Sequence, residues 1–206
     1  MSQPYAVLIT GGGSGIGAAV ARRLTAAGGQ VAICGRRAAG LRAVAAETGA
    51  LDLVCDVGDA DAVTRLVESV TGAFGRLDGL VLNAGVMAAG GVADLSPADW
   101  SAMVSANLTG AFLVARAALP HLIASRGAVV SVASIAALRA ASGMGGYAAT
   151  KAGLAMLTQS LAWITPPRGC GRTSCARAGP SPRWPTRRWW RSAPSAAWGY
   201  PRPTSW

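Results

Sequence analysis

The 206 residues of the chain are 51% hydrophobic and 14% charged, a composition that indicates one globular domain and excludes an intrinsically disordered protein. The formal net charge of +10 is unevenly spread: residues 1–163 carry 11 basic and nine acidic side chains, whereas residues 164–206 carry eight arginines and no acid. The basic charge therefore belongs mainly to the C-terminal segment, and the body of the chain is not expected to bind nucleic acid.

The sequence predicts neither export nor a membrane span. No apolar run reaches the roughly 20 residues that cross a bilayer, and the N-terminus lacks the charged-then-apolar order of a signal peptide. We therefore expect a cytoplasmic protein with no membrane partner. Cys34 and Cys55 lie in apolar runs typical of buried thiols, and because no cysteine pair has the spacing of zinc ligands we expect no metal site.

Short apolar runs alternate with segments of helical spacing over the first 162 residues. Strands are predicted at residues 5–10, 30–34, 51–55, 79–82 and 128–134. Helices are predicted from residue 18, at 38–48, 59–73, 107–125 and 146–162, and after Ser96-Pro97, which has the pattern of an N-cap and first helical residue. The alternation predicts an α/β fold, a Rossmann-type doubly wound sheet of five parallel strands with helices on both faces.

A glycine-rich turn, Gly11-Gly12-Gly13-Ser14-Gly15-Ile16-Gly17, links the first strand to the first helix. Without Cβ atoms, such a turn lets backbone N–H groups and the helix N-terminus face a pyrophosphate. The apolar strand before it and the amphipathic helix after it favour dinucleotide binding over the alternative, a turn that only packs a helix against a strand.

The end of the second strand indicates which dinucleotide is bound. NAD-binding proteins of this kind carry an acid there for the ribose hydroxyls, whereas this chain has Gly35 followed by Arg36 and Arg37. A small residue next to a guanidinium suits a 2'-phosphate, so NADP is predicted over NAD. The alternative interpretation is a solvated arginine pair that opens the next helix.

Tyr147 and Lys151, the only lysine in the chain, stand four residues apart and therefore on one face of a predicted helix. A neutral phenol is a poor acid–base catalyst near neutrality, and a nearby cation favours its phenolate form. Ser134, at the end of the fifth predicted strand, can hydrogen-bond a carbonyl oxygen that the Tyr147 hydroxyl also reaches. Together these residues predict a site for proton transfer to or from a carbonyl.

With these motifs in this order, residues 5–162 resemble the short-chain dehydrogenase/reductase family. Its motifs match Thr10 to Gly17, Cys55-Asp56-Val57, Asn83-Ala84-Gly85, Asn107, Ser134, and Tyr147 with Lys151. The resemblance implies these cofactor-binding residues, to which the end of the second strand adds Arg36 and Arg37: Thr10, Gly11, Ser14, Gly15, Ile16, Gly17, Asp56, Val57, Asn83, Ala84, Gly85, Tyr147 and Lys151.

The resemblance also implies a catalytic tetrad of Asn107, Ser134, Tyr147 and Lys151. In it Tyr147 is the acid or base, Lys151 assists it and binds the nicotinamide ribose, Ser134 orients the substrate, and Asn107 supports a proton-relay water. The implied activity is NADP-dependent interconversion of a small-molecule carbonyl and a secondary alcohol. The family's dimers and tetramers imply a homo-oligomer for a form of the protein whose whole sequence is read in the family's reading frame.

The resemblance ends at about residue 162. Residues 165–206 contain no Leu, Ile, Val or Met but eight of the eleven prolines and five of the seven tryptophans, so no core strand is predicted there. Reading GC-rich synonymous codons for Cys170–Trp189 in a shifted frame gives VRANVVCPGWAVTPMADEAV, which has the family's missing strand, Pro-Gly motif and the start of its lid. We therefore interpret residues 163–206 as an out-of-frame, disordered tail beyond a 1–162 cofactor-binding domain.

This interpretation has consequences for folding and for activity. Without the C-terminal strands of the family, the fifth strand is expected to lack a neighbour, and the chain is expected to be poorly folded and nearly inactive.

One alternative function is a non-catalytic dinucleotide-binding module. The other is nucleic-acid binding by the tail, in which arginines bind phosphates and tryptophans stack on bases.

Overall fold

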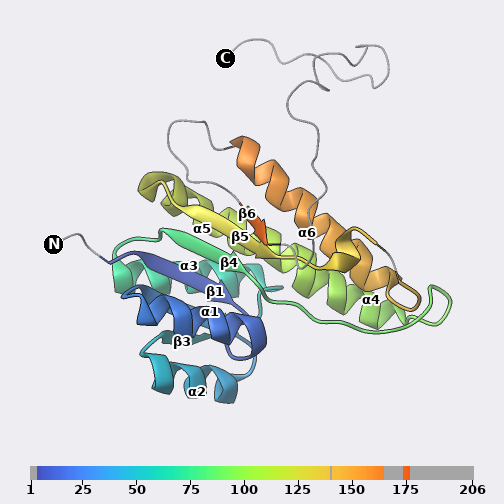
Figure 1. The fold of residues 1–206 in the computed structure, drawn as a ribbon, viewed down its shortest axis with the longest axis horizontal. Helices are drawn as coiled ribbons and strands as arrows, with labels where there is room; N and C mark the ends of the chain where they lie inside the picture. The colour runs from blue at the N-terminus through green and yellow to red at the C-terminus, as the bar shows by residue number, and fades with distance from the viewer. Residues whose placement is uncertain (1–3, 140, 165–173, 177–206) are drawn as a thin grey trace, which may run out of the picture.

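The computed structural model describes residues 4–139, 141–164 and 174–176. They form a parallel sheet of six strands in the order β3-β2-β1-β4-β5-β6, with helices on both faces (Figure 1). The strands are β1 (Ala6–Thr10), β2 (Gln30–Gly35), β3 (Leu51–Val54), β4 (Gly79–Leu82), β5 (Ala128–Val132) and β6 (Ser174–Ala176). The predicted doubly wound α/β fold is confirmed.

The helices lie close to the predicted ranges. They are α1 (Gly15–Ala26), α2 (Ala38–Thr48), α3 (Ala60–Phe74), α4 (Pro97–Val104), the π-helical turn η1 (Ser105–Thr109), α5 (Gly110–Ser125), the 3-10 turn η2 (Ile135–Ala137) and α6 (Gly145–Ile164). The predicted cap of α4 is present: the Ser96 hydroxyl accepts the Asp99 N–H at 3.0 Å and donates to its carboxylate at 2.8 Å.

Alternating side chains of the strands build one hydrophobic cluster on each face of the sheet. On β1, Leu8 faces the cluster that contains residues of α3, α5 and α6, whereas Val7 and Ile9 face the cluster that contains residues of α1 and α2. This is the period-two alternation expected of a strand covered on both faces. Every residue of β1 is buried, as expected for a strand in the middle of such a sheet.

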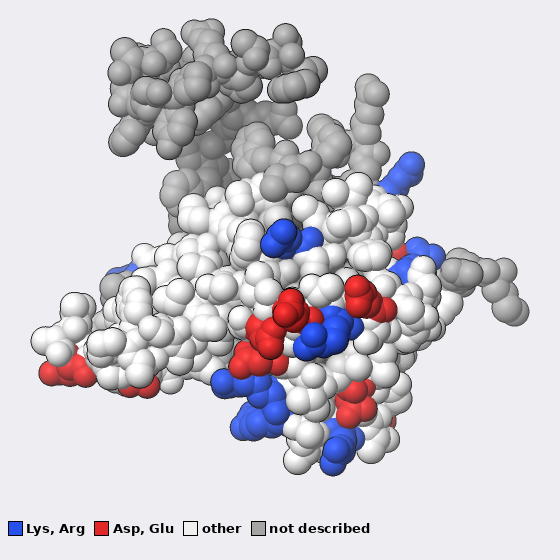
Figure 2. Space-filling view, turned by 180° about the vertical axis from the view of Figure 1, so that it is seen from behind, with Lys and Arg blue, Asp and Glu red and all other residues white. Residues whose placement is uncertain are grey.

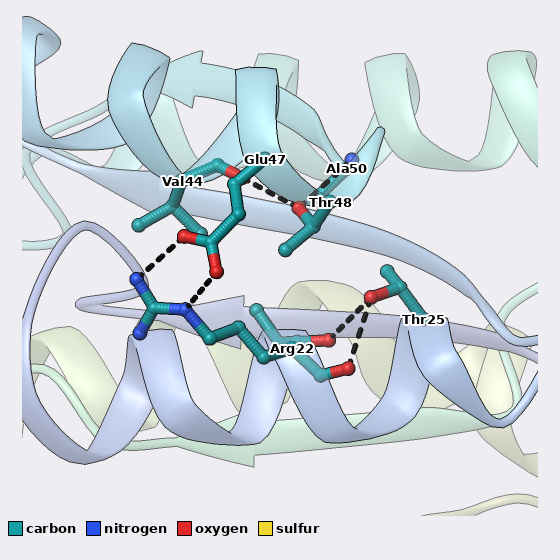
Figure 3. Close-up of polar contacts among 7 residues, drawn as sticks. Arg22, Thr25, Val44, Glu47, Thr48 and Ala50 are labelled. Atoms are coloured by element: carbon teal, nitrogen blue, oxygen red, sulfur yellow. Dashed lines mark hydrogen bonds and ion pairs between the residues drawn. The ribbon is translucent and has the colours of Figure 1, made fainter.

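Helices α1 and α2 lie next to each other on one face and are linked by an ion pair (Figure 3). The Arg22 guanidinium donates two hydrogen bonds to the Glu47 carboxylate, at 2.7 and 2.8 Å. This hydrogen bonding, more than the Arg22 charge, lowers the pKa of Glu47. Both side chains are about half exposed, so the pair joins the two helices at the surface but contributes little stability.

Strand β6 corrects the prediction for the C-terminal segment. The sequence predicts five strands and an unpaired edge at the fifth, but Ser174–Ala176 pair in parallel with Val130–Val132 of β5. The prediction was wrong because it considered side-chain hydrophobicity, whereas a short parallel pairing needs only backbone donors and acceptors, and these three residues include no proline. The interpretation of the rest of 165–206 as an out-of-frame tail lies outside the described residues.

The helical stretch Pro97–Ser125, which runs through α4, η1 and α5, is long and apolar enough to cross a membrane by length and composition alone. Its mean hydropathy reaches 1.4 over an 18-residue window. Val114, Ala118 and Leu122 on this stretch belong to the core cluster beside α3. A helix that packs against a sheet needs apolar residues for that contact, so it can pass the same test of length and composition without crossing a membrane.

Charged side chains of both signs lie interspersed on the face shown in Figure 2. On that face the described part of the chain presents no continuous basic surface of the kind that attracts a nucleic-acid backbone.

Asp78, just before β4, connects the beginnings of three strands. Its carboxylate accepts the Ala6 N–H at 2.8 Å and two bonds from Arg76, at 2.8 and 2.6 Å. Its backbone N–H donates to Ala6 O, and its carbonyl accepts the Ala128 N–H. Partial burial acts to raise the pKa of Asp78, but the hydrogen bonds from Arg76 and Ala6 and the Arg76 charge together lower it.

We expect Asp78→Asn to lower the free energy of unfolding at pH 7 by about 1 kcal/mol, because a charged acceptor that bonds Arg76 becomes neutral. Because the folded-state pKa is lowered, this stability is present above the unfolded-state pKa of about 3.9 and is lost as the pH falls through the folded-state value. Urea unfolding from pH 7 to pH 2 measures both effects. Asp52→Asn, at a carboxylate outside these bonds, is the control, and a pH-independent loss in Asp78→Asn would contradict the expectation.

Candidate active site

The glycine turn after β1 is packed too closely for side chains. Gly11 has a φ of +67°, in the left-handed region, and a Cβ there would lie 2.9 Å from Asn83 Nδ2. A Cβ on Gly12 would lie 2.5 Å from Ile33 Cβ, and one on Gly17 would collide with the Gly11 carbonyl oxygen. The turn therefore brings α1 and β1 into direct backbone contact, with Ser14 as the N-cap residue of α1.

Thr10 and Asn83 hold the turn against the end of β4. The Thr10 hydroxyl is buried; it donates to Val81 O and accepts the N–H groups of Asn83 and Ala84, both at 3.0 Å. The Asn83 amide in turn donates to Thr10 O at 2.9 Å and Gly11 O at 3.1 Å. These side chains fix the carboxyl ends of two adjacent strands.

A cleft of about 410 Å³ opens above these strand ends. Nine predicted cofactor-binding residues line it: Gly11, Ser14, Arg36, Arg37, Asp56, Val57, Asn83, Ala84 and Gly85. The other predicted cofactor-binding residues are not among its lining: Thr10, Gly15, Ile16, Gly17, Tyr147 and Lys151. Of these, Thr10 and Gly17 are buried beneath the turn, whereas the Ile16 side chain is 60% exposed.

Two arginines and a carboxylate stand at one end of the cleft. Arg36 and Arg37 are both exposed, and Arg37 donates from a terminal guanidinium nitrogen to the Ser14 hydroxyl at 3.2 Å. The Asp56 carboxylate accepts the Gly58 N–H at 3.0 Å. Positive charge therefore flanks the glycine turn beside Gly35, the small residue that ends β2.

Asn107 lies in the π-helical turn between α4 and α5 and is completely buried. Its Oδ1 accepts the Val86 N–H at 2.7 Å, and its Nδ2 donates to Val86 O at 2.9 Å and to Thr150 Oγ1 at 2.9 Å. A π turn inserts one extra residue into a helix, which redirects the side chain at that point. The carboxamide thus links η1, the segment after β4 and helix α6.

Lys151 is the buried cation of the site. Lys151 lies on α6 and is only 3% exposed. Its ammonium donates a hydrogen bond to Val132 O at 2.9 Å. The ammonium lies 5.8 Å from the centre of the Tyr147 ring, one helical turn earlier. Burial lowers the pKa of Lys151.

Gly85 makes room where the cleft meets these residues. A Cβ on Gly85 would lie 3.2 Å from Asn107 Oδ1 and 3.3 Å from Lys151 Nζ. Gly85 also lines the cleft, so the carboxamide and the ammonium stand directly behind its wall. The structure therefore brings Asn107 and Lys151 together around Gly85, although they are 44 positions apart in the sequence.

Ser134 is the N-cap residue of the 3-10 turn η2, and its hydroxyl oxygen accepts the Ala136 N–H at 3.1 Å. The turn packs against α6, the helix that carries Tyr147 and Lys151. Ser134 follows Val132, the carbonyl partner of Lys151, by two residues. Ser134 and Lys151 are therefore attached to the same end of β5.

Sequence reasoning missed three residues that position this site: Val86, Val132 and Thr150. Val86 and Val132 act through backbone groups, which no side-chain pattern reveals. The sequence could have indicated Thr150, because this residue stands directly before Lys151 in the helix that carries Tyr147. Its hydroxyl donates to Tyr147 O at 2.8 Å.

Cys34 and Cys55 are buried, as predicted, and Cys55 also lines the cleft. Burial raises the pKa of both thiols, so they remain protonated at neutral pH. Among the described residues, no group of three or more His, Cys, Asp or Glu side chains is placed to hold a metal ion.

Comparison with known proteins gives consistent matches. The family model of the short chain dehydrogenases matches residues 5–174. A (2S)-[(R)-hydroxy(phenyl)methyl]succinyl-CoA dehydrogenase subunit of Thauera aromatica is 39% identical over 166 residues, which are 78% of this chain and 66% of that protein. An L-fucose dehydrogenase of Bos taurus is 37% identical over 166 residues, which are 76% of this chain and 58% of that protein. The chain thus spans less than two thirds of the length of these relatives.

Solved structures share the fold. The crystal structure of a metagenomic short-chain oxidoreductase in complex with NADP superposes with a TM-score of 0.81 at 34% identity, covering 87% of this chain and 85% of that one.

We expect Gly17→Ala to lower the free energy of unfolding by about 1–3 kcal/mol, because the added methyl group must displace the Gly11 carbonyl or the Asn83 amide. Gly72→Ala in α3 is the matched control, since a Cβ there meets nothing within 4 Å. The control should be stabilised by about 0.5–1 kcal/mol, because alanine favours a helix more than glycine does. Urea unfolding followed by circular dichroism compares the two; equal stabilities would show that the turn tolerates a side chain.

Proposed function

The chain belongs to the short-chain dehydrogenase family, and on that premise we propose that it is an oxidoreductase that uses NADP to interconvert a carbonyl and a secondary alcohol. The observation that carries the proposal is the buried Lys151 ammonium beside Tyr147, behind the wall of a glycine-lined cleft. We infer that the two side chains act together in proton transfer to or from the substrate oxygen.

The cleft fits a dinucleotide. A Cβ at Gly11 or Gly17 would collide with Asn83 or with the Gly11 carbonyl, so the glycines let the turn pack tightly at the floor of the cleft. The first backbone N–H groups of α1 have no partner within the helix and are suited to a pyrophosphate. Asp56 and Val57 would meet the adenine, and Asn83 to Gly85 the middle of the molecule. When bound, the nicotinamide exchanges a hydride with the substrate carbon.

Arg36 and Arg37 support a preference for NADP. Both line the cleft beside Gly35, where the chain has no acid to receive the ribose hydroxyls of NAD. The hydrogen bond from Arg37 to Ser14 holds one guanidinium over the glycine turn. A guanidinium there would bind a 2'-phosphate by charge-assisted hydrogen bonds, while NAD remains a weaker alternative.

Tyr147 is the proposed acid–base residue. In the reducing direction its hydroxyl gives a proton to the substrate oxygen, and in the oxidising direction its phenolate takes that proton back. Ser134 orients the substrate: because its oxygen already accepts the Ala136 N–H, its own hydrogen is available for the substrate oxygen. Lys151 has hydrogens beyond the one given to Val132 O, which suit the nicotinamide ribose hydroxyls.

We further propose that residues 1–162 act as the cofactor-binding domain of a homo-oligomer, with a small-molecule substrate.

Solved relatives include a Burkholderia phymatum protein in complex with NAD, which is 27% identical and has a TM-score of 0.78 over 86% of this chain and 66% of that one. The family thus accommodates both cofactors.

Tyr147→Phe should lower NADP-dependent turnover by about 100- to 10,000-fold, because the only lost atom is the proton-transferring oxygen. Binding of NADPH, measured by fluorescence titration, should change by less than about twofold, since the ring remains in place. Tyr5→Phe is the control: Tyr5 stands directly before β1, its hydroxyl donates to Leu24 O at 3.3 Å, and its loss should leave turnover unchanged. Full activity of Tyr147→Phe on a panel of alcohols and carbonyls would refute the assignment.

Arg36→Ala and Arg37→Ala, made separately, should each weaken NADP binding by about ten- to a hundredfold, the range expected for a lost charge-assisted hydrogen bond. NAD binding should change by less than about twofold, because NAD lacks the 2'-phosphate. Arg42→Ala, at an exposed arginine of α2 outside the cleft lining, serves as the control. Isothermal titration with both cofactors makes the comparison, and equal losses for NADP and NAD would exclude the phosphate role.

A further inference from the structure

Thr150 connects the predicted acid–base helix to the buried carboxamide of Asn107. It lies between Tyr147 and Lys151 on α6 and is 1% exposed. Its hydroxyl donates to the backbone oxygen of Tyr147 at 2.8 Å and accepts from Asn107 Nδ2 at 2.9 Å. One hydroxyl therefore bonds both the Tyr147 backbone and a residue 43 positions earlier in the chain.

The direction of this bond agrees with the orientation of the Asn107 amide that the Val86 backbone also requires. Because the single hydroxyl hydrogen is committed to Tyr147 O, Thr150 Oγ1 can only accept from Asn107. The amide must then present its NH₂ group to Thr150 and its oxygen to the Val86 N–H, at 2.7 Å. The second NH₂ hydrogen meets Val86 O at 2.9 Å, so all of the amide's donors are occupied.

This arrangement reaches the wall of the cleft. Val86 follows Gly85, and Gly85 lies against both Asn107 Oδ1 and Lys151 Nζ. Since Val86 is held from both of its backbone groups by the Asn107 amide, the amide orientation sets where Gly85 and Val86 stand relative to Lys151. Both residues line the cleft.

We propose that Thr150 is a positioning residue: its hydroxyl locks the Asn107 carboxamide, and through it the Gly85-Val86 segment, against the helix that carries Tyr147 and Lys151. The proposal rests on the proposed redox function for its catalytic consequence, and on the hydrogen bonds alone for the lock itself. A loosened lock would let the cleft wall move relative to the Tyr147 and Lys151 side chains. The turnover rate would fall more than the affinity for cofactor and substrate, because proton transfer depends strongly on the positions of the reacting groups.

Three variants of the full chain test the consequence. Thr150→Val removes the hydroxyl and keeps the shape, and Thr150→Ser keeps the hydroxyl. Thr158→Val is the matched control: Thr158 is equally buried on the same helix, and its hydroxyl pairs with Ser131 at 2.6 Å, outside the site. Both valine variants lose a buried hydroxyl pair and should be less stable than the wild type, as a thermal unfolding scan would report.

The kinetic constants then separate positioning from stability. We expect Thr150→Val to lower kcat by about ten- to a hundredfold while KM for NADP and for the alcohol changes by less than about twofold. Thr150→Ser should restore kcat, and Thr158→Val should keep it. An unchanged kcat in Thr150→Val would overturn the proposal. If Thr150→Val does not fold, Thr150→Ala, which places no methyl group against Asn107 Nδ2, takes its place.

A measurement without turnover tests the lock itself. In the ¹⁵N-labelled protein, the Asn107 side-chain NH₂ pair, assigned by its loss in Asn107→Asp, should exchange slowly with solvent in the wild type, Thr150→Ser and Thr158→Val. It should exchange rapidly in Thr150→Val. If the wild type oxidises no alcohol, the proposed function fails and this exchange experiment alone decides the lock; slow exchange in Thr150→Val overturns it.

Discussion

A charged ammonium held almost out of solvent is the constraint on which this site depends. A buried cation is costly unless it is hydrogen-bonded, and in the described part of the chain Lys151 donates to the Val132 carbonyl at the end of β5. The position of that carbonyl requires β5 to be in register with β4, and the space in front of the ammonium requires a glycine at position 85. The sheet, the glycine and the Tyr147 helix thus all serve to place one charge.

The topology explains where the cleft opens. The chain proceeds from β1 outward through β2 and β3, then returns to the other side of β1 with β4, β5 and β6. Loops that follow β1 and β4 therefore diverge to opposite faces and leave a crevice at their carboxyl ends. Thr10 and Asn83 stand at these two ends, and the side chain of each bonds the backbone of the other, so hydrogen bonds join the two strand ends at the floor of the crevice.

Local patterns predicted most of this architecture. The strand and helix ranges agree because apolar alternation and caps such as Ser96 are local signals. The Asn107 amide contacts could not be predicted, since they depend on a π turn and on partners 21 and 43 residues away. Strand β6 was missed because its residues lack the apolar character of a core strand, yet they pair in parallel with β5.

The Asp78 contacts also bear on the order in which the sheet can form. Its carboxylate bonds the first residue of β1 across 72 positions of sequence, whereas β2 follows β1 within one helical crossover. During synthesis, β1 and β2 can therefore pair while the other edge of β1 still lacks β4. Parallel pairing between segments far apart in the sequence forms slowly because a long loop must close first, so β1 keeps one unpaired edge until residues 79–81 pair with it.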